Sequence, residues 1–319
     1  MLQFLVKRLI GLVFVLLGVT FITFIIGYAA PGDPIRVMMG QHFDLHTWLR
    51  LRHAYGLDLP WYEQYYNFLV HLFRLNFGLS YHYPNRSVNS ILLEGVPISI
   101  ELAFWGLIIT ILIGIPAGVL SAVKANSWID TTNMAIALIF YAVPVFALCV
   151  FAQAFIGWFN TSFDTEWPVS NWGIPWQYSW SDIQFKLAPI LVYGAAGYAY
   201  FARIARTNML EVLRQDYIRT ARAKGLRERV IIYRHALRNA MIPIITYIGY
   251  LIGLLVAGAF FVEHIFNIPG IAQTTVQASF DRDYPVIQAT VVLIATGTVL
   301  GNMIADILYT VFDPRIKLS

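Results

Sequence analysis

The sequence predicts an all-α membrane protein with six transmembrane helices and both ends of the chain in the cytoplasm. Composition is the first observation: of the 319 residues, 58% are hydrophobic and only 13% charged, and the mean hydropathy is +0.62. The second is that six apolar runs are each long enough for a helix to cross a bilayer, which takes about 20 residues. The third is the uneven distribution of Lys and Arg along the chain, which indicates orientation.

The six expected spans are residues 9–30, 98–123, 131–159, 188–206, 241–262 and 286–311. Several are longer than a bilayer requires, so we expect those helices to tilt or to project beyond the membrane. With the N-terminus inside, the inner segments carry 15 of the 22 Lys and Arg residues and the outer segments carry 7. Because basic residues favour the cytoplasmic side, this arrangement is preferred. The net charge of +4 therefore reports topology and does not suggest nucleic-acid binding.

Residues 31–95, between the first two spans, predict a long segment outside the cytoplasm. The run PGDP at 31–34 ends the first helix, because prolines interrupt helical hydrogen bonding. We expect two short helices in this segment, near 45–55 and 60–75, the second rich in the aromatic residues that favour a membrane interface. A second outer segment, 160–186, predicts either an aromatic belt with internal packing or a docking surface or lid. Its four tryptophans are Trp167, Trp172, Trp176 and Trp180.

The most polar stretch is 216–226, DYIRTARAKGL, between the fourth and fifth spans on the inner side. Asp216 suits a helix N-cap and Gly225 suits the position just past a helix, so the stretch predicts a two-turn helix at 217–224. Such a short helix is marginal in water by itself, so something must pack against it. Anionic lipid head groups are one candidate. The ordered pattern of cap, helix and glycine favours a protein partner instead.

A second, amphipathic helix is expected to begin near Arg227 and lead back into the membrane. Its predicted apolar face and its predicted basic face follow from spacings of three and four residues. The apolar face is expected to hold Val230, Tyr233, Leu237 and Met241, and the basic face Arg227, Arg234 and Arg238.

These residues closely resemble the inner signature loop of binding-protein-dependent ABC importer permeases, and more narrowly of the dipeptide/oligopeptide/nickel branch. The loop match comprises 216–226, HALRNA at 235–240 and Pro243. Agreeing motifs elsewhere are LQF at 2–4 with KR at 7–8, PGDP at 31–34, GLD at 56–58, GIPAG at 114–118, EHIF at 263–266 with PG at 269–270, RDYP at 282–285 and DPR at 313–315. The general permease pattern has Glu-Ala-Ala where this chain has Arg219, Thr220 and Ala221, and Leu-Pro where Leu237 precedes Arg238. Both departures are usual in the peptide branch.

The resemblance implies a type I importer permease that moves di- or oligopeptides across the bacterial cytoplasmic membrane. It divides the chain into an N-terminal transmembrane helix (1–30), an extracytoplasmic region (31–95), a permease core (96–311) with its coupling loop at about 208–240, and a tail (312–319). Implied partners are a second, related permease, two cytoplasmic ATPases that hold ATP and Mg, and an outer substrate-binding protein. The residues implied to dock on the ATPase are Asp216, Tyr217, Arg219, Thr220, Ala221, Arg222, Ala223, Lys224, Gly225 and Leu226. Alternatives are the same machinery importing nickel, glutathione or another small solute, or an ion-gradient-driven transporter.

No sequence motif indicates an enzyme. A phosphate-binding P-loop requires Gly-Lys-Ser or Gly-Lys-Thr, and none of the five lysines follows a glycine, so we expect no nucleotide or other cofactor in this chain. His42, His46 and His53 are separated by four and seven residues and could form a metal site on a continuous helix. We favour exposed histidines with no metal role and predict no metal site.

Three acids lie near the expected spans: Glu101, Glu263 and Asp306. Carboxylates at membrane depth either line a pathway or pair with other groups. We favour structural pairing of these acids or solvation at the helix ends, because Glu101 and Glu263 are near the outer ends of their helices. The alternative is that they meet the ammonium group of a peptide cargo.

Overall fold

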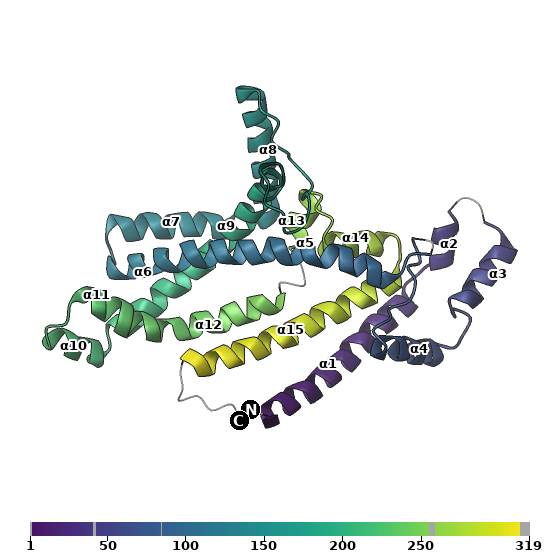
Figure 1. Cartoon of the computed structure of the whole chain (residues 1–319), viewed down its shortest axis with the longest axis horizontal. Helices are drawn as coiled ribbons and strands as arrows, with labels where there is room; N and C mark the ends of the chain where they lie inside the picture. The colour runs from purple at the N-terminus through teal and green to yellow at the C-terminus, as the bar shows by residue number, and fades with distance from the viewer. Residues whose placement is uncertain (1, 41–42, 84, 255–258, 313–319) are drawn as a thin grey trace.

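The computed structural model describes residues 2–40, 43–83, 85–254 and 259–312 of the chain (Figure 1). Regular structure in these residues is helical, apart from one isolated antiparallel bridge between Leu79 and Ser87. In chain order the elements, with two π-helical turns labelled η, are α1 (Leu2–Ala29), α2 (Pro34–Met39), α3 (Leu45–Ala54), α4 (Trp61–Phe73), α5 (Val88–Ile109), η1 (Thr110–Gly114), α6 (Ile115–Val123), α7 (Trp128–Ala142), α8 (Val145–Phe163), α9 (Trp180–Leu213), α10 (Asp216–Ala223), α11 (Glu228–Val230), η2 (Ile231–Ala236), α12 (Leu237–Leu254), α13 (Phe260–Ile265), α14 (Ile271–Phe280) and α15 (Tyr284–Phe312).

Five helical segments in the described residues are long and apolar enough to cross a membrane. They are Ile10–Ala29, Val88–Val123, Val145–Phe163, Trp180–Leu213 and Tyr284–Ile304. The remaining expected span, 241–262, falls partly on residues 255–258, which lie outside the described residues; α12 covers its first part. The chain is therefore an all-helical, multi-pass membrane protein.

The expected third span, 131–159, is wrong as a single helix. α7 ends at Ala142 and α8 begins at Val145, with Val143 in an extended conformation (φ −81°, ψ 121°). Pro144 explains the break, because the ring of a proline disfavours helical geometry in the residue before it. α8 then turns away from the body of the molecule and projects beyond the other long helices, while it keeps contact with α9 (Figure 1).

α9 is longer than the expected span 188–206 because it continues in both directions. Its 34 residues extend about 51 Å at 1.5 Å per residue, more than the roughly 30 Å hydrocarbon core of a bilayer. The helix packs against α5, η1, α6, α7, α8 and α12. α9 therefore runs from the end of the molecule that carries α10 to its contacts with α8 and α13 (Figure 1).

The contacts of α9 with α5 and α6 depend on glycines that let the backbones approach. A Cβ placed on Gly118 of α6 would lie 2.3 Å from the carbonyl oxygen of Ala202, and one on Gly194 of α9 would lie 2.6 Å from a methyl group of Ile109. Small residues at such crossings are typical of helices packed within membranes. The neighbouring η1 precedes Pro116, whose missing N–H removes one helical hydrogen bond and favours a widened turn.

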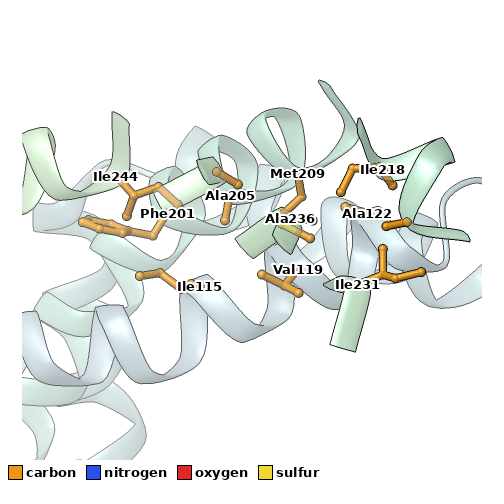
Figure 2. Packing of buried hydrophobic residues seen from close by; sticks show 12 residues of the cluster. Ile115, Val119, Ala122, Phe201, Ala205, Met209, Ile218, Ile231, Ala236 and Ile244 are labelled. Carbon is orange, nitrogen blue, oxygen red and sulfur yellow. The ribbon is translucent and has the colours of Figure 1, made fainter. Parts of the chain in front are cut away.

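The largest buried cluster lies where α6, α9, α10, η2 and α12 meet (Figure 2). It brings two turns of α6 and the last turns of α9 against the short helix α10. Its buried members are Ile115, Val119, Ala122, Phe201, Ala205, Met209, Ile218, Ala221, Ile231, Ala236, Ala240 and Ile244.

The two helices expected in the outer segment are confirmed as α3 and α4. Asp44 caps α3 by accepting a hydrogen bond from the N–H of Thr47, and α4 begins after Pro60. The hydroxyl of Tyr65 on α4 lies 3.2 Å from the carbonyl oxygen of Leu17, and its ring packs on Phe21 and Phe24 of α1. α4 is therefore held against the apolar helix α1.

The start of α1 and the end of α15 lie side by side. The two helices are in contact, and the guanidinium of Arg8 donates to the carboxylate of Asp306. This contact brings together residues from the two ends of the chain.

We predict that Gly118→Ala lowers the melting temperature of the detergent-purified protein, because the added methyl group meets the backbone of α9. Overpacking of this kind costs about 1–3 kcal/mol. The matched control is Gly157→Ala in α8, where an added Cβ meets nothing within 4 Å. It should leave stability unchanged or raise it by about 1 kcal/mol through helix propensity. Equal melting temperatures for the two variants would contradict the packing described here.

Candidate functional site

The segment predicted to couple to a partner forms the helix α10 at one end of the molecule (Figure 1). The helix covers Asp216–Ala223, one residue earlier than expected, and Gln215 occupies the N-cap position in place of Asp216. The prediction of Asp216 as the cap is therefore wrong. In the first turn its carboxylate still opposes the positive end of the helix dipole, and it lies 3.3 Å from the guanidinium of Arg219.

The end of α10 is stopped by glycine geometry, as predicted. Gly225 has φ +73°, a left-handed conformation that residues with a Cβ rarely adopt. Its N–H donates to the carbonyl of Arg222 at 2.9 Å, and the N–H of Leu226 donates to the carbonyl of Ala221 at 3.3 Å. These two bonds form a Schellman motif, which satisfies carbonyls that the helix end leaves free.

α10 has one face inside the molecule and one face outside it. Ile218 is fully buried and Ala221 is 7% exposed, both in the cluster of Figure 2. Ala221 is among the residues implied to dock on the ATPase, but its side chain packs against the chain's own core and is not free to enter a partner's cleft. Ala223 is exposed and remains available. The other exposed residues of the predicted docking set are Asp216, Tyr217, Arg219, Thr220, Arg222, Lys224, Gly225 and Leu226.

Two hydrogen bonds tie α10 to the segment that follows. The guanidinium of Arg222 donates to Glu228 at 2.7 Å, and the side-chain amide of Asn239 donates to the hydroxyl of Tyr217 at 2.7 Å. Both bonds lie at the surface, so their contribution to stability is small beside that of apolar burial. The Tyr217–Asn239 bond links α10 directly to α12, and the Arg222–Glu228 bond links it to α11.

The apolar face predicted for the second helix is wrong at its start, whereas its later members Leu237 and Met241 do pack against the buried cluster. Val230 and Tyr233 are exposed, whereas Ile231 and Ala236 are fully buried. The π-helical turn η2 explains the difference, because it places residues five apart on the same side of the helix. Spacings of three and four residues therefore select the wrong side chains at this point. The predicted basic residues Arg227, Arg234 and Arg238 are exposed.

A bidentate ion pair fixes α7 to α9 near the cluster that holds α10. The guanidinium of Arg206 donates to the two carboxylate oxygens of Asp130 at 2.6 and 2.7 Å. Asp130 also accepts from the N–H of Asn126 in the turn between α6 and α7. Sequence reasoning missed this pair, because the partners lie 76 residues apart.

Glu101 is fully buried in an ion pair. Its carboxylate accepts from the ammonium of Lys186 at 2.8 Å, from the indole N–H of Trp172 at 2.9 Å and from the N–H of Trp176 at 2.9 Å. The same ammonium donates to the carbonyls of Ile174 and Gln177. Of the two favoured possibilities, Glu101 is structurally paired and is not solvated by water, because the segment between α8 and α9 folds over it.

Lys186 ends the predicted outer segment 160–186, but in the structure it lies within α9 and its side chain is 2% exposed. Of the four tryptophans expected near it, Trp172 is fully buried, whereas Trp176 and Trp180 are exposed and Trp167 contacts Trp180 edge to face.

Glu263 is also fully buried, so it too is bonded within the protein and is not solvated by water. Its carboxylate accepts from the N–H groups of Ala272 at 2.9 Å and Gln273 at 3.2 Å, in the first turn of α14. It also accepts from the hydroxyl of Ser99 at 2.8 Å. Glu263 therefore caps α14 from a neighbouring helix and joins it to α5.

The three histidines that could have formed a metal site are not brought together as a described group. His42 lies outside the described residues, and His46 and His53 lie on α3. The imidazole Nδ1 of His53 is 2.7 Å from the carboxylate of Asp58, and this hydrogen bond raises the pKa of His53. Within the described part of the chain, no group of three potential metal ligands occurs.

Comparison with known proteins identifies relatives over the whole length of the chain. A family model described as binding-protein-dependent transport system inner membrane component matches residues 114–318, and its N-terminal counterpart matches 1–103. The dipeptide transport system permease protein DppB of Alkalihalophilus pseudofirmus is 37% identical, covering 99% of this chain and 100% of the relative. The oligopeptide transport system permease protein AppB of Bacillus subtilis is 36% identical with the same coverage. The glutathione transport system permease protein GsiC of Escherichia coli K12 is 34% identical, covering 99% of both chains.

One solved structure shows a similar fold. A chain of the MetNI methionine ABC transporter in inward-facing conformations superposes with a TM-score of 0.56 at 21% identity, covering 70% of this chain and 97% of that chain.

We predict that Glu101→Gln and Lys186→Met each destabilise the protein by about 3–5 kcal/mol, because each leaves the partner charge buried and unpaired. The double variant should cost clearly less than the sum of the two, since neither charge then remains. Denaturation of the three purified variants and the wild type measures this coupling. Additive losses would mean that the two charges do not depend on each other.

Proposed function

The chain belongs to the family of binding-protein-dependent transport system inner membrane components, and we propose that it is a permease subunit of an importer for di- and oligopeptides. In this proposal it lies in the bacterial cytoplasmic membrane with α10 on the cytoplasmic side. A second, related permease completes the pathway, and an outer binding protein delivers the cargo. Two cytoplasmic ATPases hold ATP and Mg and drive the cycle.

The observation that carries the proposal is the two-faced packing of α10. A helix of two turns is unstable alone, yet here Ile218 and Ala221 hold it firmly against the core. This leaves an outward face that ends in the exposed small residue Ala223 and carries Arg219 and Lys224. A rigid, exposed helix with cations at its edge suits a cleft whose rim offers carboxylates or carbonyls.

The same packing supports a route for the motion. Ile218 contacts a cluster that includes Val119 of α6, Met209 of α9 and Ile244 of α12. Because packed helices move as rigid units, displacement of α10 by a motor would move these three helices together. The Arg206–Asp130 pair would carry α7 along with α9. Alternation between inward-facing and outward-facing states then follows from repacking of the helices.

Peptide cargo is supported by the names of the relatives. Two are named for dipeptide and oligopeptide transport, and a third for glutathione, which is itself a tripeptide. A free amino group, amide bonds and a carboxylate are common to dipeptides, oligopeptides and glutathione. We therefore propose short peptides as the substrate class.

We predict that Ala223→Trp reduces recovery of the ATPase with this chain by about tenfold, because a bulky side chain keeps α10 out of its cleft at a cost of at least 1.4 kcal/mol. Ala223 is exposed, so the variant should keep its melting temperature. Ala54→Trp on the exposed end of α3, at the opposite end of the molecule, is the matched control and should leave association unchanged. Full association and transport by Ala223→Trp would remove α10 from the docking surface.

Energy supply distinguishes this proposal from an ion-gradient-driven transporter. In proteoliposomes that contain the complete complex, we expect peptide uptake to require ATP on the side of α10 and to persist when ion gradients are collapsed. Uptake that follows the gradient and ignores ATP would overturn the proposed function.

A further inference from the structure

A cavity of about 400 Å³ lies at the end of the molecule opposite α10. Its walls are formed by the first turns of α5, by α14 and by the start of α15, together with His82, Tyr83 and Arg86. Its floor is apolar and buried, formed by Ile91, Ile98, Ala278 and Val286. The volume falls within the range of about 300–1,000 Å³ that is typical of small-ligand sites.

Charged side chains of both signs stand along this cavity. The guanidinium of Arg86 donates to the carboxylate of Glu94, and these side chains are 39% and 66% exposed. The imidazole Nε2 of His82 lies 3.6 Å from the carboxylate of Asp281. Exposed ion pairs of this kind are worth about 0–1 kcal/mol, so a ligand that offers both charges can replace the Arg86–Glu94 pair at little cost.

The cavity walls are held in place by buried carboxylates. Asp283 is 1% exposed and accepts from the hydroxyl of Ser80 and from the N–H groups of Tyr81 and His82 at 3.0 and 3.3 Å, which fixes the segment before Arg86. Ser99 of α5 accepts from the N–H of Ile271 at 2.8 Å while it donates to Glu263, which fixes α14 against α5. The charged side chains that line the cavity are therefore carried by backbone segments that hydrogen bonds already hold in place.

A second cavity, of about 300 Å³, lies between α5, α9, α12 and α13 and has a different chemistry. Its lining includes Tyr193, Tyr200 and Tyr247 and, as far as the described residues reach, no Asp, Glu, Lys or Arg. Such a lining cannot select a ligand by its formal charges. Within the described chain, charge recognition is therefore better served by the first cavity.

We propose that the first cavity receives the ends of a short peptide, with Glu94 binding its ammonium group and Arg86 binding its carboxylate. This inference rests on the proposed function, in which peptides arrive at this end of the molecule. The apolar floor accommodates a hydrophobic side chain of the cargo, and the side chains of Gln273 and Gln277 line the wall beside its amide groups. Glu263, which the sequence suggested for the ammonium group, is saturated by bonds within the protein and shapes the site from behind.

The test measures equilibrium binding of the dipeptide Ala-Phe to the purified complex of permeases and ATPases, without the binding protein. Glu94→Gln should raise the dissociation constant about tenfold, because one hydrogen bond to a charged group is weakened. The wild type should bind N-acetyl-Ala-Phe as weakly as Glu94→Gln binds Ala-Phe, and the variant should bind both peptides alike. Glu166→Gln is the matched control, an exposed carboxylate outside the cavity, and should change nothing.

Arg86→Gln is the second variant. It should raise the dissociation constant of Ala-Phe about tenfold. It should leave the dissociation constant of Ala-Phe amide, whose C-terminus carries no charge, unchanged. Unchanged melting temperatures show that the variants fold.

Equal affinities of wild type and Glu94→Gln for Ala-Phe, or no binding of Ala-Phe to the wild type, would overturn the inference. So would an equal loss for free and acetylated peptides, which indicates a structural effect. Uptake of Ala-Phe by the complete wild-type system separates the two proposals, because its absence contradicts the proposed function instead.

Discussion

Burial of one face of α10 against α6, α9 and α12 is the contact on which the rest of this structure depends. A two-turn helix gains too little from its own hydrogen bonds to remain folded in water. Ile218 and Ala221 provide the missing stability by removing apolar surface from water inside the cluster of Figure 2. Because the contact is apolar and close-packed, α10 cannot swing freely, and force applied to it reaches the long helices directly.

The buried carboxylates of this apolar chain have a structural role. Glu101, Glu263 and Asp283 are each at most 1% exposed, and each accepts several hydrogen bonds from other parts of the chain. A buried carboxylate is tolerated only when it is paired or fully hydrogen-bonded, so each of these acids orders the segment that satisfies it. Glu101 orders the segment between α8 and α9, Glu263 the start of α14, and Asp283 the segment before α5.

α9 links these two kinds of contact. Near its beginning, Lys186 is held in the ion pair with Glu101, and near its end Met209 is buried beside Ile218. Glycines on α6 and α9 keep the backbones close between these points. In the proposed function, this long helix would connect the docking surface at one end with the buried Glu101–Lys186 pair at the other, without relying on a flexible linker.

The sequence by itself determined the helical class, most of the long helices, the short helices α3, α4 and α10, and the glycine that ends α10. These features depend on local causes, namely apolar run length, capping residues and the backbone freedom of glycine. The break at Pro144 also had a local signal, which the length of the surrounding apolar run obscured.

Only the tertiary structure decided which side chains of α10 face inward, which face of the following helix is buried, and what each acid contacts. Ala221 and Ala223 are equally small, and their difference lies in what packs beside them. The shift at η2 changes the helical period, so no fixed spacing could reveal it. Glu101 and Lys186 are 85 residues apart, and Ser99 and Glu263 are 164 apart. Contacts across such separations depend on how the helices pack, which local sequence patterns do not encode.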